Sequence, residues 1–178
     1  AGHRNDDGGW GDTTKSRSNI ATTVLAWSAF AAAGGEAMHA AAVEGAEGWL
    51  RRAAGGSGTE DLVRAIEARY GKDRTFSAPI LTMAALAGRL GAGADAWRPV
   101  VPLPFELAAL PNRLFRWLRL PVVSYALPAL IAIGQVRHRH LPGGILPLRL
   151  VRDALGERTL GVLERIQPSS GGFLEATP

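Results

Sequence analysis

The stretch DGGWGDTT at residues 7–14 and the stretch QPSSGGF at residues 167–173 decide the fold. Each stretch belongs to a pattern of a polar residue, a glycine four positions later and a large aromatic residue two positions after the glycine. These positions hold Arg4, Gly8 and Trp10 in the first copy, and Gln167, Gly171 and Phe173 in the second. Glycine permits positive φ and close backbone approach, and an aromatic ring buries a large flat area. We therefore expect two structural staples between helices, and a repetitive helical architecture between them.

The sequence between the two turns has helical periodicity and no alternating pattern typical of strands. From an N-cap at Ser18, apolar residues recur three and four positions apart as far as the glycine pair at residues 34–35. The pattern predicts an all-α protein built from paired helices. The other expected segments are helices at 36–52, 59–70, 76–90, from Pro104 onward, at 122–133, at 146–155 and at 157–166, with a basic loop at 137–140.

Composition excludes several classes of function. The 178 residues are 47% apolar and carry a formal charge of +4, which is typical of a packed globular protein with solvated basic faces. The absence of cysteine removes disulfides, thiolate catalysis and cysteine-containing zinc sites, and fits a cytoplasmic protein. Basic residues cluster only at 137–140, so we expect no nucleic-acid partner.

The chain resembles the squalene–hopene cyclases and related class II triterpene cyclases. The Asp-Gly-Gly-Trp turn and the closing Gln-x-x-x-Gly-Gly-Phe are similar to the QW motifs of that family. Three further segments are similar to the family's and follow in its order. They are DRTFSAPILT at 73–82, WRPVVPLPFEL at 97–107 and LPVVSYALP at 120–128. The resemblance covers nearly the whole chain.

The resemblance implies an (α/α) barrel within a double-barrel enzyme. Residues 1–135 would form an inserted barrel domain, and residues 136–178 a basic loop and return helices that lead into the second, catalytic barrel. Such enzymes cyclise squalene, or a related polyprenoid lipid, by a proton-initiated carbocation cascade without a cofactor. Aromatic faces in a cavity that excludes water stabilise the cations. The family's part in hopanoid and terpenoid biosynthesis makes the expected activity that of an isomerase.

One departure from the family concerns the catalytic acid. The family protonates a terminal alkene with an aspartic acid in an Asp-x-Asp-Asp motif, and no such motif occurs in this sequence. In the family that motif lies downstream of the second turn, whereas this chain ends at Pro178. The resemblance therefore implies a fragment of a longer enzyme that does not cyclise squalene by itself.

Three residues match positions of the family's substrate cavity. Tyr125 stands where the family often has a cavity-facing tryptophan, and an ordinary buried aromatic is the alternative. The last two, Thr177 and Pro178, stand where hopene cyclases carry Gln-Pro, and Thr177 leaves the glutamine's role in placing a water unfilled. No metal site is expected, because arginines flank His138 and His140, which favours a solvated loop.

Other functions and partners stay open. A non-catalytic α/α-barrel protein that binds an isoprenoid lipid or a protein is the main alternative, and a homodimer is compatible with either. The apolar stretch at 114–133, beside three arginines, fits peripheral contact with a membrane, and squalene cyclases are monotopic. A protein prenyltransferase β subunit shares the barrel but needs a cysteine in its zinc site, and this sequence has none.

Overall fold

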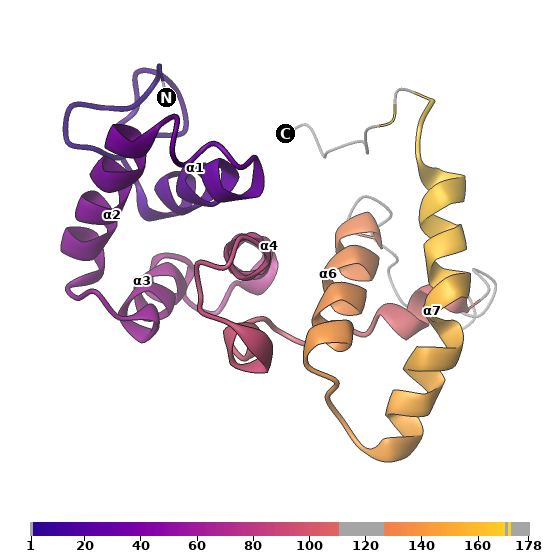
Figure 1. Cartoon of the computed structure of the whole chain (residues 1–178). Coiled ribbons are helices and arrows are strands. Elements are labelled where there is room, and N and C mark those ends of the chain that lie inside the picture. The colour runs from indigo at the N-terminus through magenta and orange to yellow at the C-terminus, as the bar shows by residue number, and fades with distance from the viewer. Residues whose placement is uncertain (1, 111–126, 170, 172–178) are drawn as a thin grey trace. The chain divides into compact units, whose positions relative to one another are not determined.

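The computed structural model describes residues 2–110, 127–169 and 171, and every regular element in these ranges is a helix (Figure 1). The all-α class predicted from sequence is therefore confirmed for the described residues. The α-helices are α1 (Ile20–Ala32), α2 (Ala40–Ala54), α3 (Thr59–Tyr70), α4 (Arg74–Leu86), α6 (Leu127–His140) and α7 (Leu146–Ile166). Two short 3-10 helices are η1 (Gly93–Trp97) and η2 (Phe105–Ala109).

The chain divides into two compact units, Ala1–Val100 and Val101–Pro178. In the first unit, α1 packs against α2, α3 and α4, and α3 contacts both α2 and α4. Fully buried apolar side chains come from all four helices, which places one core between them. They include Val24, Ala46, Ile66, Leu81 and Ala84. The predicted domains, residues 1–135 and 136–178, stay predictions, as does the barrel.

Local capping explains where the helices of the first unit begin and end. The side chain of Asn19 accepts the N–H of Thr22 at 3.0 Å and caps α1, so the predicted N-cap at Ser18 is wrong by one residue. The hydroxyl of Ser18 instead donates to Asp7 at 2.6 Å. At the other end of the next helix, Gly55 takes a left-handed φ of 72° and terminates α2.

The described part of the second unit has three elements, η2, α6 and α7, which contact one another. The basic residues 137–140, predicted as a loop, form the last turn of α6. That prediction is wrong because His138 is buried against neighbouring elements, and the helix continues to His140. The two helices predicted at 146–155 and 157–166 are one helix, α7, of 21 residues.

Gly156 lies at the predicted break in α7, and its carbonyl is held from both sides. The hydroxyl of Thr159 donates to this carbonyl at 2.9 Å, and the side-chain amide of Gln135 on α6 donates to it at 3.0 Å. These bonds secure the helix at a residue that lowers helix propensity. Among the described residues, no helix combines the length and the apolar character that crossing a membrane requires.

Candidate functional site

The first Gly-aromatic turn lies with its backbone directly against α2. The N–H of Gly8 donates to the carbonyl of Asn5 at 3.0 Å, and Gly8 has a φ of 95°. A β-carbon added at Gly8 would stand 2.6 Å from the carbonyl oxygen of Gly45 on α2. Both the positive φ and this close approach require glycine.

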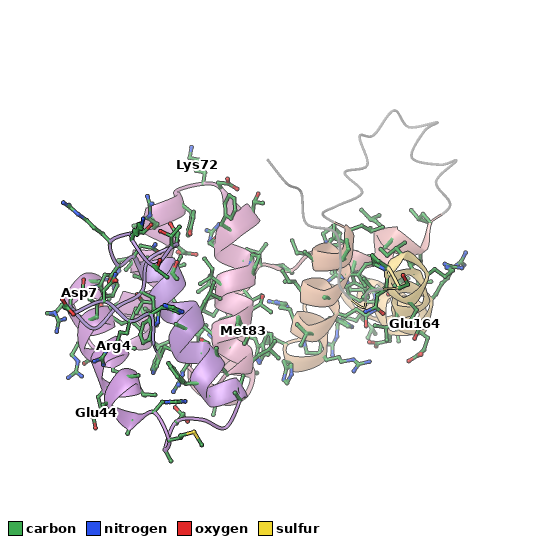
Figure 2. The ribbon with its side chains drawn as sticks, turned by 90° about the horizontal axis from the view of Figure 1, so that it is seen from above. Arg4, Asp7, Glu44, Lys72, Met83 and Glu164 are labelled. Atoms are coloured by element: carbon green, nitrogen blue, oxygen red, sulfur yellow. The ribbon has the colours of Figure 1, made fainter. Side chains whose placement is uncertain are left out.

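Arg4, the polar residue of this turn, reaches the same helix. Its Nη1 donates to the carbonyl of Ala41 in the first turn of α2. A β-carbon at Gly45 would stand 2.5 Å from the same Nη1. The two glycines, Gly8 and Gly45, thus make room for the turn and for its arginine. Figure 2 shows Arg4 and Asp7 in the N-terminal loop of this unit.

Trp10 joins α1 to α2. It is 8% exposed and clusters with Ala42 and Ala46 of α2. Its ring centroid lies 6.0 Å from that of Phe30 on α1. Its backbone N–H donates to Thr23 Oγ1, also on α1, at 2.9 Å. The aromatic residue of the turn therefore buries its ring between two helices while its backbone bonds to one of them.

Asp7 is a residue of this turn whose role the sequence did not reveal. Its carboxylate accepts hydrogen bonds from the Ser18 hydroxyl at 2.6 Å, the Gly9 N–H at 3.0 Å and the Trp49 Nε1 at 3.0 Å. The bonds from Ser18 and Gly9 hold the pKa of Asp7 below its ordinary value of 3.8. An aspartate followed by glycines, as at Asp7, is a local signal for a turn in which the carboxylate accepts the N–H two residues later.

The second turn has two described features in common with the first. The N–H of Gly171 donates to the carbonyl of Pro168 at 2.9 Å, and Gly171 has a φ of 81°. This is the same bond, three residues back, that Gly8 makes. The polar residue differs in its partner, because the side-chain amide of Gln167 donates within the turn to the carbonyl of Gly171 at 2.6 Å.

The remaining predicted residues lie outside the described part of the chain. They are Phe173 of the second turn and the three cavity residues Tyr125, Thr177 and Pro178. Arg4, Gly8 and Trp10 come together on α2, whereas Gln167 and Gly171 contact each other at the end of α7.

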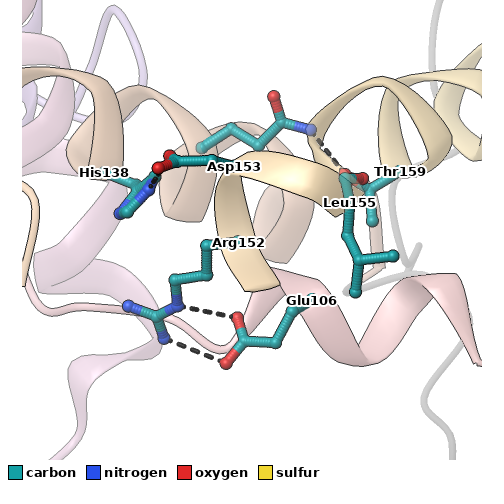
Figure 3. A network of polar contacts seen from close by, with 7 residues as sticks. Glu106, His138, Arg152, Asp153, Leu155 and Thr159 are labelled. Atoms are coloured by element: carbon teal, nitrogen blue, oxygen red, sulfur yellow. Dashed lines mark hydrogen bonds and ion pairs between the residues drawn. The ribbon is translucent and has the colours of Figure 1, made fainter. Parts of the chain in front are cut away.

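A polar network in the second unit joins its three elements (Figure 3). Arg152 of α7 donates from Nε and Nη2 to the two carboxylate oxygens of Glu106 in η2, at 3.0 and 3.1 Å. Both side chains are largely buried, with exposed fractions of 8% and 13%. The guanidinium also lies 5.7 Å from the ring centroid of Phe105, which adds a cation–π contact to the bidentate pair.

His138 connects α6 to the same region. It is 7% exposed, its Nε2 lies 2.8 Å from Oδ1 of Asp153, and its ring centroid lies 5.8 Å from that of Phe105. The predicted solvated histidine is therefore wrong at this position. One turn earlier on α6, the amide of Gln135 donates to Thr159 Oγ1 at 2.6 Å. The network ties α6 and α7 together at two levels.

Three aspartates of the first unit have the opposite property from an alkene-protonating acid. Hydrogen bonds hold the pKa of Asp7, Asp12 and Asp73 below the ordinary value, chiefly from the side chains of Ser18, Thr22 and Thr75 respectively. An acid that stays protonated needs burial or a neighbouring negative charge instead. Within residues 2–110, 127–169 and 171, no three histidine, aspartate or glutamate side chains gather as metal ligands would.

Comparison with known proteins adds no assignment: no protein-family model, no curated protein and no solved structure matches the chain. The geometry of the two turns and the resemblance in sequence therefore carry any functional proposal.

Proposed function

We propose that the chain is part of a class II triterpene cyclase, an isomerase that cyclises squalene or a related polyprenoid lipid. One observation carries the proposal. The two turns whose spacing resembles the QW motif each have a glycine of positive φ whose N–H bonds to the carbonyl three residues back. A motif that recurs in sequence and also in backbone conformation supports a repeated structural unit.

The contacts of the first turn indicate what that unit does. The turn joins α1 to α2 through Trp10 and holds the first turn of α2 through Arg4. An (α/α) barrel consists of such helix pairs placed side by side, and a staple at each pair would hold its helices in register. The barrel is therefore the tertiary arrangement that we propose for this chain.

Within the enzyme, we assign this chain to the scaffold and the cavity wall. The proposed wall residues are Tyr125, Thr177 and Pro178, taken from their places in the sequence pattern. The sequence has no Asp-x-Asp-Asp, so the proton that starts the cascade would come from another part of the enzyme. Since protonation of an alkene starts the reaction, no cofactor is required.

The test is incubation of the natural full-length protein with squalene, with extraction and mass spectrometry of the products. Cyclic triterpenes are expected. A Tyr125→Phe variant keeps the ring face and should keep the product pattern, whereas Tyr125→Ala should shift products toward early-terminated, partly cyclised species. If neither variant alters the products of an active enzyme, Tyr125 is not part of the cavity wall.

A second candidate is a protein that binds an isoprenoid lipid without transforming it. The absence of an Asp-x-Asp-Asp motif from this sequence supports this alternative. It predicts saturable squalene binding by the full-length protein and no cyclic product after prolonged incubation. Cyclic product in the same experiment would exclude it.

We also propose peripheral contact with a membrane from the cytoplasmic side. The beginning of α7 supports this, because the exposed side chains of Ile145, Leu146 and Leu150 lie beside Arg149. Apolar side chains with adjacent cations suit an anionic lipid surface. Co-sedimentation of the full-length protein with phosphatidylcholine vesicles containing phosphatidylserine tests it. Leu146→Glu should reduce binding, and the matched change at exposed Leu86 in the first unit should not.

A further inference from the structure

A pocket of about 200 Å³ lies within the first unit. The residues of α2 that line it differ from those that the Gly-aromatic turn contacts. Side chains of α1, α2, α3 and the residue Arg89 after α4 line it together with the glycine-containing loop 55–58. This volume corresponds to about seven water molecules at the density of the liquid. The pocket therefore suits a small molecule rather than a C30 chain.

One wall of the pocket is built from interlocked side chains. The guanidinium of Arg89 lies 4.2 Å from the ring centroid of Trp27, and its Nη2 donates to the Trp27 carbonyl at 2.8 Å and to Glu36 at 2.7 Å. The Arg89 side chain is only 11% exposed. On the other side, Trp27 Nε1 donates to Glu47 Oε1 at 3.2 Å. These bonds fix the wall before any ligand arrives, which reduces the entropy lost on binding.

Besides Arg89, whose charge is paired with Glu36, two opposite charges line this pocket without pairing with each other. Glu47 and Arg51 are four residues apart on α2, a spacing at which such side chains commonly pair on a helix surface. Both line the pocket. Among the described residues, however, the exposed guanidinium of Arg51 makes no hydrogen bond or ion pair, and the Glu47 carboxylate is engaged only at Oε1, by Trp27.

The apolar part of the lining is well defined. Leu50 of α2 is 4% exposed and Leu62 of α3 is 7% exposed, and Ala54, the last residue of α2, also lines the pocket. A ligand with one charge would meet a like charge beside its partner, because an anion paired with Arg51 lies near Glu47 and a cation paired with Glu47 lies near Arg51 on the same helix. Like charges brought together in this way reduce affinity. Only a ligand that carries both charges on an apolar body matches every part of the lining.

We propose that this pocket binds a small zwitterion with an apolar side chain, the chemistry of a free hydrophobic amino acid. Its ammonium group bonds to Glu47, its carboxylate pairs with Arg51, and its side chain lies against Leu50 and Leu62. The site is independent of the proposed cyclase activity, because it uses none of the turn or cavity residues.

Three probes with the same branched apolar end separate the two charges. They are L-leucine, 4-methylpentanoate, which lacks the ammonium group, and 3-methylbutylamine, which lacks the carboxylate. We expect L-leucine to bind to the chain with a Kd on the order of 1 mM, and each single-charge probe to bind at least about tenfold more weakly. Binding is followed by the chemical shift of the Trp27 indole N–H in ¹H–¹⁵N spectra and by calorimetry.

Variants assign the two contacts. Arg51→Ala removes an exposed side chain without a bonding partner among the described residues, and Glu47→Gln retains an oxygen for Trp27 while losing the charge. Each should weaken L-leucine binding about tenfold. Arg69→Ala, an exposed arginine of α3 outside the pocket, is the matched control and should change nothing. Far-UV circular dichroism confirms that all three variants fold.

The proposal is overturned by any of three results. L-leucine producing no shift of the Trp27 resonance at high concentration excludes the site. Equal binding of 4-methylpentanoate and L-leucine excludes a role for Glu47. An Arg51→Ala variant that binds L-leucine as the parent does, or an Arg69→Ala variant that loses binding, excludes the assigned carboxylate contact. None of these outcomes depends on squalene turnover.

Discussion

Each of the two units is stabilised internally by a different kind of contact. The first unit has fully buried apolar side chains from four helices, with polar bonds mainly in its N-terminal turn. The second unit places a bidentate ion pair, Glu106 with Arg152, and a buried histidine between its three elements. An apolar core loses stability gradually as atoms are removed, whereas a buried ion pair leaves a charge unpaired when one partner is lost. The second unit should therefore be the more sensitive to single polar substitutions.

The largest expected effect is at Arg152. Arg152→Met leaves the Glu106 carboxylate buried without its cation and should destabilise the second unit by about 3–5 kcal/mol. Urea denaturation followed by hydrogen-exchange mass spectrometry of residues 127–166 measures this for the second unit alone. The double variant Glu106→Leu/Arg152→Met removes both charges and should recover most of the loss. A double variant as unstable as the single one would show that packing, and not the unpaired charge, causes the effect.

The corresponding test in the first unit is Trp10→Ala. Removing a ring that is 8% exposed between α1 and α2 should destabilise this unit by about 3 kcal/mol, since large-to-small changes in a core lose both burial and packing. Hydrogen exchange of residues 20–54 should accelerate, while exchange of residues 127–166 stays unchanged. Met38→Ala, at a side chain that is 83% exposed, is the control. Equal losses in the two variants would contradict the staple role of Trp10.

The two turn glycines, Gly8 and Gly171, differ in the atoms that surround them. Both have positive φ, but an added β-carbon meets the Gly45 carbonyl at Gly8 and no atom of the described residues at Gly171. Gly171→Ala should lose only the conformational term, about 1 kcal/mol. Gly8→Ala adds a backbone clash and should lose about twice as much. Thermal unfolding monitored by circular dichroism compares them, and equal losses would mean that the turn can move away from α2.

The smallest effect concerns acid. A carboxylate whose folded-state pKa is lowered stabilises the fold above its unfolded pKa, near 3.8, and loses that contribution as pH falls through the folded value. Asp7 should therefore make the first unit less stable below about pH 4. Asp7→Asn should flatten this dependence in the first unit and leave that of the second unit unchanged. Urea midpoints measured from pH 6 to about pH 3 test it, and an unaltered slope would exclude Asp7 as its source.

The sequence predicted the features that depend on local patterns. The all-α class and the end of α3 before Gly71 follow from periodicity and glycine signals. The N-cap of α1 was misplaced because Ser18 and Asn19 are both suitable caps, and the choice depends on the distant Asp7 carboxylate, to which the Ser18 hydroxyl donates. Local signals of this kind do not distinguish adjacent candidates.

Contacts between distant residues could not be predicted in the same way. Glu106 and Arg152 are 46 residues apart, and nothing in either neighbourhood specifies the other. The basic run at 137–140 was assigned to a loop because charge usually indicates solvent, whereas the burial of His138 depends on Phe105 and Asp153. In the turn, spacing identified Arg4, Gly8 and Trp10 as a group, but their common partner helix required the structure.

The position of the first turn on α2 also limits where the chain can change in length. Arg4 bonds at Ala41 and Gly8 lies against Gly45, so the turn contacts two points on α2 that are about one helical turn apart. Inserting one residue between these points would rotate one contact by about 100° relative to the other. An insertion in the connection at residues 33–39 leaves both contacts in place. Natural length variation should therefore collect in that connection and avoid the segment between Ala41 and Gly45.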